Sequence, residues 1–383
     1  MHIVFVEVGY PGPSGNVGGA GTYVHNFGKF LAKKGHNVSV LCSQMPNISN
    51  TYKDGLINVY PVIATKPTSL IYYSSRVPIL KLLSRLLFYI HNGLKIHRFL
   101  SGLNRKFKID YIEYTEGGDF WNAITKKFKY SAHLHGSPYT FMNQSGKIKS
   151  KAYWISRIVE HYFIKRANKV LSPSYAMLKL VEKEMNQKIK QAHVIPYPVD
   201  EGGIIKYRKS KEVRLIFASR NDPVKGGDLF INALELLPQK IQSRINVEFY
   251  GFVPQCDLSS LPFLQIHEFV PKEILKIAYQ AADICIIPSL FDNSPNTVYE
   301  AMANGKIVVA SSVGGIPEII GGVANGFIFD PSDINDFVEK LEDAIKIVLN
   351  GECQIMRINA QQHINKISNL AINAKKRLKV IEF

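Results

Sequence analysis

Residues 284–305 read ICIIPSLFDNSPNTVYEAMANG. The apolar run Ile284–Pro288 predicts a strand, and the pattern of Thr297–Asn304 predicts a helix that begins near Asn296 after a polar loop. A short, continuously apolar strand that leads into a helix is typical of a parallel sheet with helices on both faces. This segment therefore predicts an α/β fold.

The same alternation continues along the chain. The strands expected are 2–8, 37–43, 58–62, 110–115, 131–135, 169–172, 193–196, 213–219, 246–250, 264–267, 284–288, 307–311 and 326–329, with helices such as 22–34, 227–237 and 272–282 between them. The pattern restarts after Val199–Gly203, so we expect a doubly wound, Rossmann-like domain over residues 1–203 and a second over 204–355. The polar helical stretch 356–383 is expected to pack back on the first domain. Such sheets bind ligands at the carboxyl ends of their strands, which predicts a cleft between the two domains as the site.

Size and composition agree with two soluble-type domains. The chain has 383 residues, of which 46% are hydrophobic. The four cysteines, Cys42, Cys256, Cys285 and Cys353, have no CxxC spacing, which favours free thiols in a reducing compartment. We see no secretory leader and no apolar run long enough to span a membrane, and expect a cytoplasmic protein.

The excess of basic over acidic residues lies entirely in the first half of the chain. Residues 1–200 hold 27 Lys and Arg against 10 Asp and Glu, whereas residues 201–383 hold 20 against 21. A basic face indicates an anionic partner, such as a membrane surface, a nucleic acid or an acidic substrate. No zinc-finger or RNA-recognition motif accompanies it, so we expect no nucleic acid.

Two glycine-containing turns could bind phosphate. The segment Gly9–Gly21 follows a strand and precedes a helix, where free amides and the helix dipole favour an anion. Its glycine spacing does not fit a nicotinamide-dinucleotide fingerprint or a P-loop. In the second domain, Arg220 and Lys225 flank a tight turn at a strand end, and together they could hold a diphosphate.

These motifs together resemble the retaining glycosyltransferases of family 4, which have the GT-B fold. The resemblance rests on Asp292-x7-Glu300, on Ala301-Met302-Ala303-x-Gly305 and on Gly314-Gly315-Ile316-Pro317-Glu318. Arg220-x4-Lys225-Gly226 and the N-terminal glycine loop occur upstream in the matching order. The resemblance covers roughly residues 3–345, with the dense motifs in the second domain.

The resemblance implies roles for individual residues. Glu300 would bind the ribose hydroxyls, Asp292 the donor sugar, and Arg220 and Lys225 the donor phosphates. Asp stands where most relatives have Glu, so sugar choice stays open. His135 matches the active-site histidine at a strand end. The remaining positions implied to bind the nucleotide-sugar fall in three groups. Gly18 and Gly19 would lie near the diphosphate, and Glu268, Phe269 and Val270 near the base. The loop and helix start would add backbone contacts to the phosphates from Asn293, Ser294, Pro295, Asn296 and Thr297.

The resemblance also implies the chemistry. The acceptor would attack the face from which the nucleotide leaves, a phosphate oxygen would take the proton, and the anomeric configuration would be retained. There is no Asp-x-Asp motif and no His/Cys cluster, so we expect no essential metal and no cofactor beyond a UDP- or GDP-sugar. Charge on the departing diphosphate would be stabilised by cations and helix starts. A nicotinamide-dependent oxidoreductase and a non-catalytic nucleotide-sugar-binding protein are the alternatives.

The acceptor side is less defined. Ile79, Leu83, Leu86, Ile90 and Leu94 follow helical spacing, with Lys81, Arg85 and Lys95 on another face. Such a helix can lie on an anionic membrane, or it can pack on the sheet with a solvated basic rim. The basic first domain favours membrane contact at the inner face of the cell membrane. A lipid-linked glycan or a cell-envelope polysaccharide, such as lipopolysaccharide, is then the expected acceptor. Glu116, at a strand end, is a candidate acceptor contact.

Overall fold

The computed structural model describes residues 1–7, 9–11, 18–42, 50–62, 78–116, 118–137, 139–140, 143, 153–199, 202 and 211–382. The chain divides into two compact units. Unit 1 comprises Met1–Pro198 and Ala371–Phe383, and unit 2 comprises Val199–Leu370. The division lies five residues before the boundary that the sequence predicts.

Unit 1 is built on a mostly parallel sheet. Among the described residues its strand order is β3-β4-β2-β1-β5-β6-β7-β8, and only the β3–β4 pair is antiparallel. The strands are β1 (His2–Glu7), β2 (Asn37–Cys42), β3 (Tyr52–Asp54), β4 (Ile57–Pro61), β5 (Tyr111–Thr115), β6 (Tyr130–His133), β7 (Lys169–Ser172) and β8 (Ala192–Val194).

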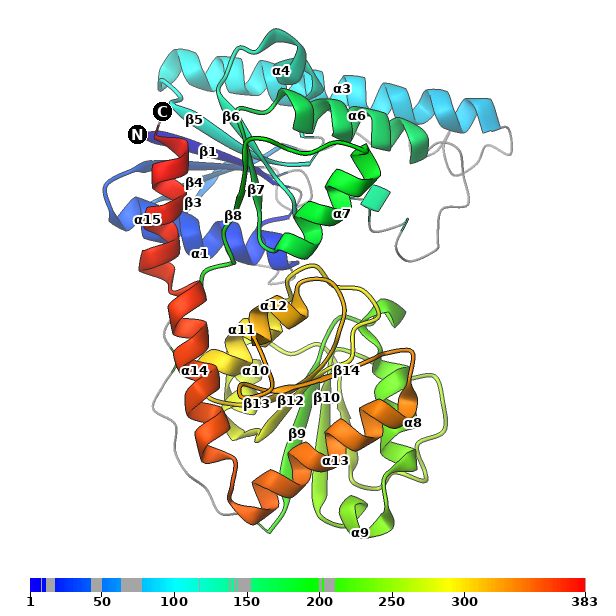
Figure 1. Ribbon diagram of the computed structural model, residues 1–383. Helices are drawn as coiled ribbons and strands as arrows, with labels where there is room; N and C mark the ends of the chain where they lie inside the picture. Colours follow the sequence, from blue (N-terminus) through cyan, green and yellow to red (C-terminus); the bar gives the residue numbers. More distant parts are fainter. Residues whose placement is uncertain are drawn as a thin grey trace. The chain divides into compact units, whose positions relative to one another are not determined.

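Helices cover both faces of this sheet (Figure 1). The helices are α1 (Gly19–Lys33), α3 (Pro78–Lys106), α4 (Phe120–Thr125), α6 (Tyr153–Arg166), α7 (Tyr175–Met185) and α15 (Leu370–Ile381). Every residue of β1 is buried because its side chains alternate between two cores. Val4 joins the cluster that includes Leu100 and Phe163, whereas the Phe5 ring lies 5.9 Å from that of Phe27 in α1.

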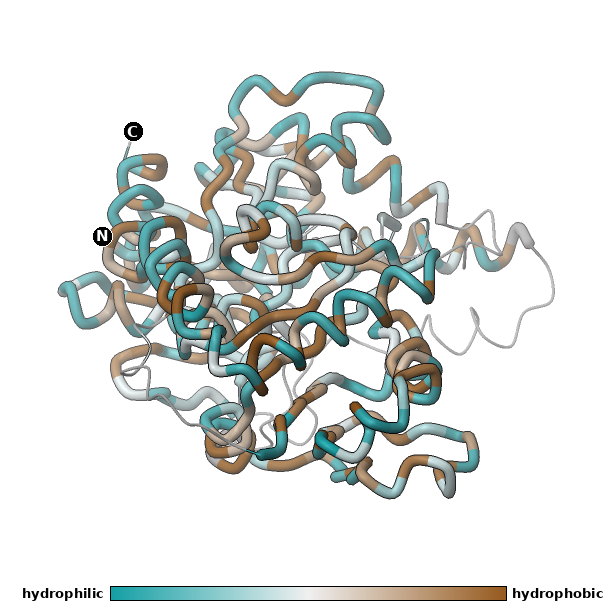
Figure 2. The backbone as a smooth tube through the Cα atoms, turned by 60° about the horizontal axis from the view of Figure 1, so that its bottom comes forward, coloured by the Kyte–Doolittle hydropathy of each residue, from teal (hydrophilic) through white to brown (hydrophobic). Residues whose placement is uncertain are grey.

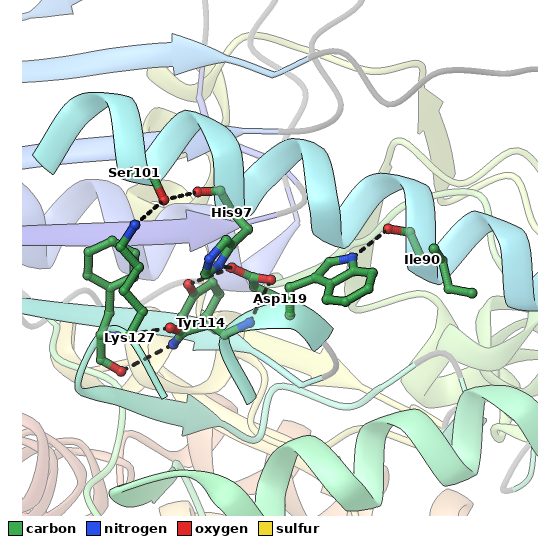
Figure 3. A network of polar contacts seen from close by, with 9 residues as sticks. Ile90, His97, Ser101, Tyr114, Asp119 and Lys127 are labelled. Atoms are coloured by element: carbon green, nitrogen blue, oxygen red, sulfur yellow. Dashed lines mark hydrogen bonds and ion pairs between the residues drawn. The ribbon is translucent and has the colours of Figure 1, made fainter. Parts of the chain in front are cut away.

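A buried polar network joins α3 to α4 and β5 (Figure 3). Asp119 accepts a hydrogen bond from the Asn122 amide as the cap of α4, and its second carboxylate oxygen lies 3.2 Å from His97 Nδ1 in α3. The Tyr114 hydroxyl of β5 donates to the same oxygen over 3.4 Å. The Trp121 indole donates to the carbonyl of Ile90. These contacts fix the middle and the C-terminal half of α3 on unit 1.

Unit 2 is a parallel sheet with the order β11-β10-β9-β12-β13-β14 in the described residues. Its strands are β9 (Val213–Ala218), β10 (Ile245–Tyr250), β11 (Leu264–His267), β12 (Ile284–Ile287), β13 (Ile307–Ser311) and β14 (Phe327–Phe329). The helices are α8 (Gly227–Leu236), α9 (Gln239–Gln242), α10 (Lys272–Ala281), α11 (Asn296–Ala303), α12 (Ile316–Ile320), α13 (Ile334–Asn350) and α14 (Gln354–Ser368), with a 3-10 turn, η1 (Pro223–Lys225). Hydropathy alternates along many of the helices, as expected for amphipathic helices (Figure 2).

Three details differ from the sequence-based expectations. Strand β6 ends at His133, because the chain turns there, so His135 lies in the following loop. The C-terminal stretch forms two helices, because Asn369 leaves helical geometry with ψ near 128°. Helix α14 belongs to unit 2, and α15 packs in unit 1. No helix in the described part of the chain has the length and apolarity needed to cross a membrane.

Candidate active site

The strand order of unit 2 reverses direction between β9 and β12. From β9 the chain first adds β10 and β11 on one side, and then crosses to add β12, β13 and β14 on the other. The loops that leave two adjacent strands at such a switch point diverge and leave room for a ligand. The loop after β9 carries Arg220 and Lys225, and the loop after β12 carries Asp292, so the sheet brings these candidate residues to one edge.

The turn after β9 is held by its own side chains and by the neighbouring loop. Asp222 accepts a hydrogen bond from the Val224 amide and caps η1. Gly226 has φ of +72°, and a Cβ there would lie 1.8 Å from the carbonyl oxygen of Pro288. Only glycine permits both this backbone conformation and this close approach. The two loops therefore interlock through backbone contact.

Lys225 and Asp292 form an ion pair across the two loops. The Lys225 Nζ lies 2.5 Å from Asp292 Oδ2, and the two side chains are 24% and 13% exposed. Arg220 is different: its side chain is 64% exposed and its guanidinium lies 4.0 Å from Asp222. An ammonium group has three donors, so Lys225 can hold Asp292 and an incoming phosphate oxygen together.

The start of α11 adds amide donors to the same edge. Its N-cap is Pro295, and no side chain caps the helix start. Asn293 and Ser294 are buried in the preceding loop. Gly314 allows that loop to approach closely, because its φ is +53° and a Cβ there would lie 1.7 Å from the Asp292 carbonyl oxygen, and the Gly315 amide donates to the Asn293 carbonyl over 2.9 Å. The first amides of α11 are thus held at a position that favours an anion.

The remaining donor-side candidates lie around this edge. Thr297 and Glu300 are half-buried on the first turns of α11. Glu268, Phe269 and Val270 follow the edge strand β11, which β10 separates from β9. Phe269 is 63% exposed and is available for stacking against a planar ligand.

Unit 1 has its own switch point between β1 and β5. Gly18 and Gly19 form the start of α1 after β1, and no side chain caps this helix start. Gly12–Val17 of the glycine-rich segment lie outside the described residues. On the other side of the switch point, Glu116 follows β5, and its carboxylate accepts a hydrogen bond from the Gly136 amide over 2.9 Å.

His135 lies in the loop after β6, next to this contact. Its side chain is 8% exposed, its Nδ1 is hydrogen-bonded to the Tyr197 hydroxyl, and its Nε2 lies 3.9 Å from Glu7. Gly136 has φ of +106°, a conformation that favours glycine, and the backbone changes direction there, immediately after the histidine. The structure therefore brings the candidates His135 and Glu116 together at the carboxyl edge of β1, β5 and β6.

A buried polar cluster lies behind His135. The His133 Nδ1 is 2.8 Å from Glu113 Oε1, and the His133 and His135 rings are 3.9 Å apart. Burial lowers the pKa of both histidines well below the usual value, and the charge of Arg377 in α15 lowers it further. Both imidazoles are therefore neutral near pH 7.

Glu113, His133 and His135 offer three possible metal-ligand atoms within 4.8 Å of one another. However, Glu113 Oε1 already accepts from the Tyr23 hydroxyl and lies 3.9 Å from the Arg377 guanidinium, which would repel a cation. The geometry fits a hydrogen-bonded support better than a metal centre.

The sequence-based prediction missed several of these residues. Glu113 could have been noticed, because a carboxylate inside an apolar strand needs a partner. No local pattern marks Tyr23, Tyr197 or Arg377.

Two protein-family models match the chain. Residues 17–202 match the model described as Glycosyltransferase Family 4, and residues 205–363 match the model described as Glycosyl transferases group 1. The two matches meet close to the division between the units.

Similar curated proteins share parts of the chain. A D-inositol 3-phosphate glycosyltransferase of Corynebacterium jeikeium is 30% identical over 167 residues, which are 40% of this chain and 39% of that protein. The sulfoquinovosyl transferase SQD2 of Arabidopsis thaliana is 41% identical over 70 residues, or 18% of this chain and 14% of that protein. The matched regions thus span well under half of these relatives.

Solved structures share the whole fold. Sucrose-phosphate synthase from Thermosynechococcus elongatus superposes with a TM-score of 0.77 at 17% identity, and covers 99% of this chain and 98% of its own. Anabaena HepE in complex with UDP has a TM-score of 0.69 at 18% identity, and covers 100% of this chain and 99% of its own. The predicted GT-B architecture of two parallel, Rossmann-like sheets is confirmed. With family models matched on both units and the Arg220–Lys225 and Asp292–Glu300 motifs at one sheet edge, this chain belongs to the family 4 (group 1) glycosyltransferases.

Proposed function

We propose that the protein transfers a hexose or N-acetylhexosamine from a UDP- or GDP-sugar to a glycan acceptor with retention of configuration. The observation that carries the proposal is the edge of unit 2, whose loops carry Lys225 and Arg220 and where no side chain caps the start of α11. This combination suits a diphosphate, because cations and helix-start amides both stabilise phosphate oxygens. HepE, whose fold is similar, was solved with UDP, which makes UDP the first nucleotide to test.

The proposed reaction exchanges one bond at the anomeric carbon for another. The bond to the diphosphate oxygen breaks, the acceptor oxygen bonds to the same face, and its proton passes to the departing phosphate. Lys225, Arg220 and the first amides of α11 would stabilise the negative charge that develops on the diphosphate. Glu300 would orient the ribose, Asp292 the sugar hydroxyls, and His135 would contact the sugar.

Substitution of Lys225 or Glu300 tests the donor site. We expect Lys225→Ala and Glu300→Ala each to lower turnover at least a hundredfold, because each removes a group that contacts the donor. Activity is measured as nucleotide release from a panel of UDP- and GDP-sugars, with folding checked by thermal melting. Lys240→Ala, which alters an exposed lysine on α9, is the control and should leave turnover unchanged. Near-normal turnover in both site variants would refute the assignment.

For the acceptor, we propose a lipid-linked glycan bound at the inner face of the cell membrane. In the first half of α3, Leu80, Leu83, Leu86 and Leu87 are 38–53% exposed. The polar residues turn inward instead: the Arg85 Nε donates to Ser156 in α6, and the Tyr89 hydroxyl donates to Glu160. Trp154 and Ile158 of α6 are 57% and 62% exposed.

This arrangement supports membrane docking over the alternative of a helix packed on the sheet by its apolar face. An exposed apolar stripe on a domain with a large excess of basic residues suits the interface of an anionic bilayer. Each basic residue near such a surface contributes about 1 kcal/mol, so a few are enough for reversible binding.

Sedimentation with liposomes tests the membrane proposal. We expect wild-type protein to bind anionic vesicles at low salt and to dissociate as salt rises, because salt screens the lipid charge. The double variant Leu83→Asp/Leu87→Asp should lose most of this binding. Leu56→Asp is the matched control, since Leu56 is a 68% exposed leucine in the β3–β4 turn of the same unit. Equal, weak binding of all proteins to anionic and neutral vesicles would exclude the docking surface.

A further inference from the structure

Arg377 carries a fully buried charge that the proposed reaction does not use. It lies on α15, near the C-terminus, and packs in unit 1 with a relative exposure of 0%. Burying a guanidinium destabilises the fold unless most of its donors are satisfied. The hydrogen-bond partners of Arg377 therefore indicate which part of the structure its burial supports.

One set of Arg377 contacts leads to the histidine pair. Arg377 Nη1 donates to the Tyr23 hydroxyl over 2.8 Å, and that hydroxyl donates to Glu113 Oε1 over 2.8 Å. The guanidinium also lies over the Tyr23 ring, 4.5 Å from its centroid. Glu113 in turn holds His133 Nδ1, and the His133 ring lies against that of His135.

A second set of contacts leads to His135 through Tyr197. Arg377 Nη2 donates to the carbonyl of Ile195 over 3.1 Å, and the Asn373 amide donates to the carbonyl of Pro196 over 3.1 Å. The next residue is Tyr197, whose hydroxyl binds His135 Nδ1. Helix α15 thus supports Tyr23, His133 and Tyr197, whose rings lie next to that of His135, although Arg377 does not touch the His135 ring.

We propose that Arg377 is a positioning residue that orients His135. This inference rests on the proposed role of His135 in the transfer reaction. The Nε2 of His135 lies 3.9 Å from Glu7, the last residue of β1, and so lies near the carboxyl edge of the sheet, where a ligand hydroxyl would meet it. The positive charge of Arg377 opposes protonation of His133 and His135. Its Nη1 and Nη2 groups hold Tyr23 and the Ile195 carbonyl by hydrogen bonds, which fixes both sets of contacts.

The charge and the geometry can be separated by two substitutions. Arg377→Lys keeps the charge but cannot make both hydrogen bonds, so turnover should fall about tenfold with the acid limb of the kcat/KM profile unchanged. Arg377→Gln removes the charge, so the pKa of His135 should rise and the acid limb of the kcat/KM profile should move to higher pH. Its kcat should also fall at least as much as that of Arg377→Lys. Tyr197→Phe should lower kcat with little loss of stability, and provides the test if Arg377→Gln does not fold.

The assay is UDP release from UDP-glucose between pH 5 and 8, with UDP affinity measured by calorimetry. Affinity for UDP should stay within twofold of wild type, because the diphosphate contacts belong to unit 2. Arg357→Lys is the matched control: Arg357 is also a buried arginine, on α14, and it pairs with Asp283 over 3.1 Å in unit 2. It should lower the melting temperature without changing the pH profile.

Three results would overturn the inference. Arg377 variants that lose stability as Arg357→Lys does, with unchanged kcat and pH profile, would show a purely structural role. If Tyr197→Phe retains the wild-type kcat, the second set of contacts, which runs through Tyr197, does not support His135. Stoichiometric divalent metal in the purified protein that disappears in His133→Ala would indicate a metal centre instead. If His135→Ala itself retains full activity, the proposed role of His135 fails. If His135→Ala loses activity while the Arg377 variants retain it, only the positioning role of Arg377 fails.

Discussion

Glu160 illustrates how burial of one carboxyl group affects stability. It lies on α6 with 2% exposure, and the Tyr89 hydroxyl donates to it. Burial, with a smaller contribution from the nearby carboxylate of Glu116, raises its pKa to about 8. Burial also raises the pKa of Glu116, to about 7. Both groups therefore hold a proton in the folded state at pH values where the unfolded chain has lost it.

The sign of the pH effect follows from this difference. At these two groups the folded state binds more protons than the unfolded state between about pH 4.5 and pH 8, so their contribution to the free energy of unfolding falls as pH rises. We expect Glu160→Gln, which keeps the shape but does not titrate, to be more stable than wild type at pH 8.5 by up to about 4 kcal/mol. At pH 5 the advantage should be small. The measurement is urea unfolding at both values.

Glu182→Gln provides a control of opposite sign. The pKa of Glu182 is lowered by its hydrogen bond with Lys188, so its charged form stabilises the fold. This variant should gain nothing at pH 8.5. A stability difference between Glu160→Gln and wild type that is the same at pH 5 and pH 8.5 would contradict the assignment for Glu160.

At the scale of elements, the attachment of α3 to the unit depends on Asp119. Its carboxylate caps α4 and also binds His97 and Tyr114, and the side chain is fully buried (Figure 3). Asp119→Ala removes the cap and leaves two buried polar groups without this acceptor. We expect a loss of about 3–5 kcal/mol in the free energy of unfolding, measured by urea denaturation.

Asp333→Ala separates the capping contribution from the rest of the network. Asp333 caps α13 through the amides of Asn335 and Asp336, and it is exposed. Its removal should cost about 1 kcal/mol, as is usual for an N-cap. If Asp119→Ala costs no more than this, the link between α3 and α4 contributes little.

At the scale of the whole molecule, the two units should respond differently to nucleotide. With saturating UDP, we expect slower amide hydrogen exchange in residues 219–227 and 288–298, where unit 2 presents its cations and helix start. A ligand at 100 times its Kd stabilises the bound state by about 2.7 kcal/mol, which is enough for a clear change in exchange. NAD should produce no such protection.

Lys225→Ala should abolish the protection by UDP. Protection by UDP that appears only in unit 1, or equally with NAD, would contradict the assignment of the nucleotide to unit 2.

The sequence by itself determined the class of fold and the motifs that we propose bind the donor. Strand β12, the polar loop and helix α11 follow one another within 20 residues, so local periodicity and spacing were enough to predict them. The same holds for the turn with Arg220 and Lys225. That these two motifs meet at one edge followed from the rule for doubly wound sheets, and the Lys225–Asp292 pair agrees with it.

Tertiary structure decided the support of His135 and the orientation of α3. Tyr23, Glu113 and Arg377 come from α1, β5 and α15, and the Arg377–Tyr23 contact joins residues 354 positions apart, which no local pattern encodes. The apolar stripe of α3 has the same helical spacing whether it faces the core or the solvent, so only packing against α6 fixes its direction. Periodicity describes one element, whereas a buried network depends on which elements the topology makes neighbours.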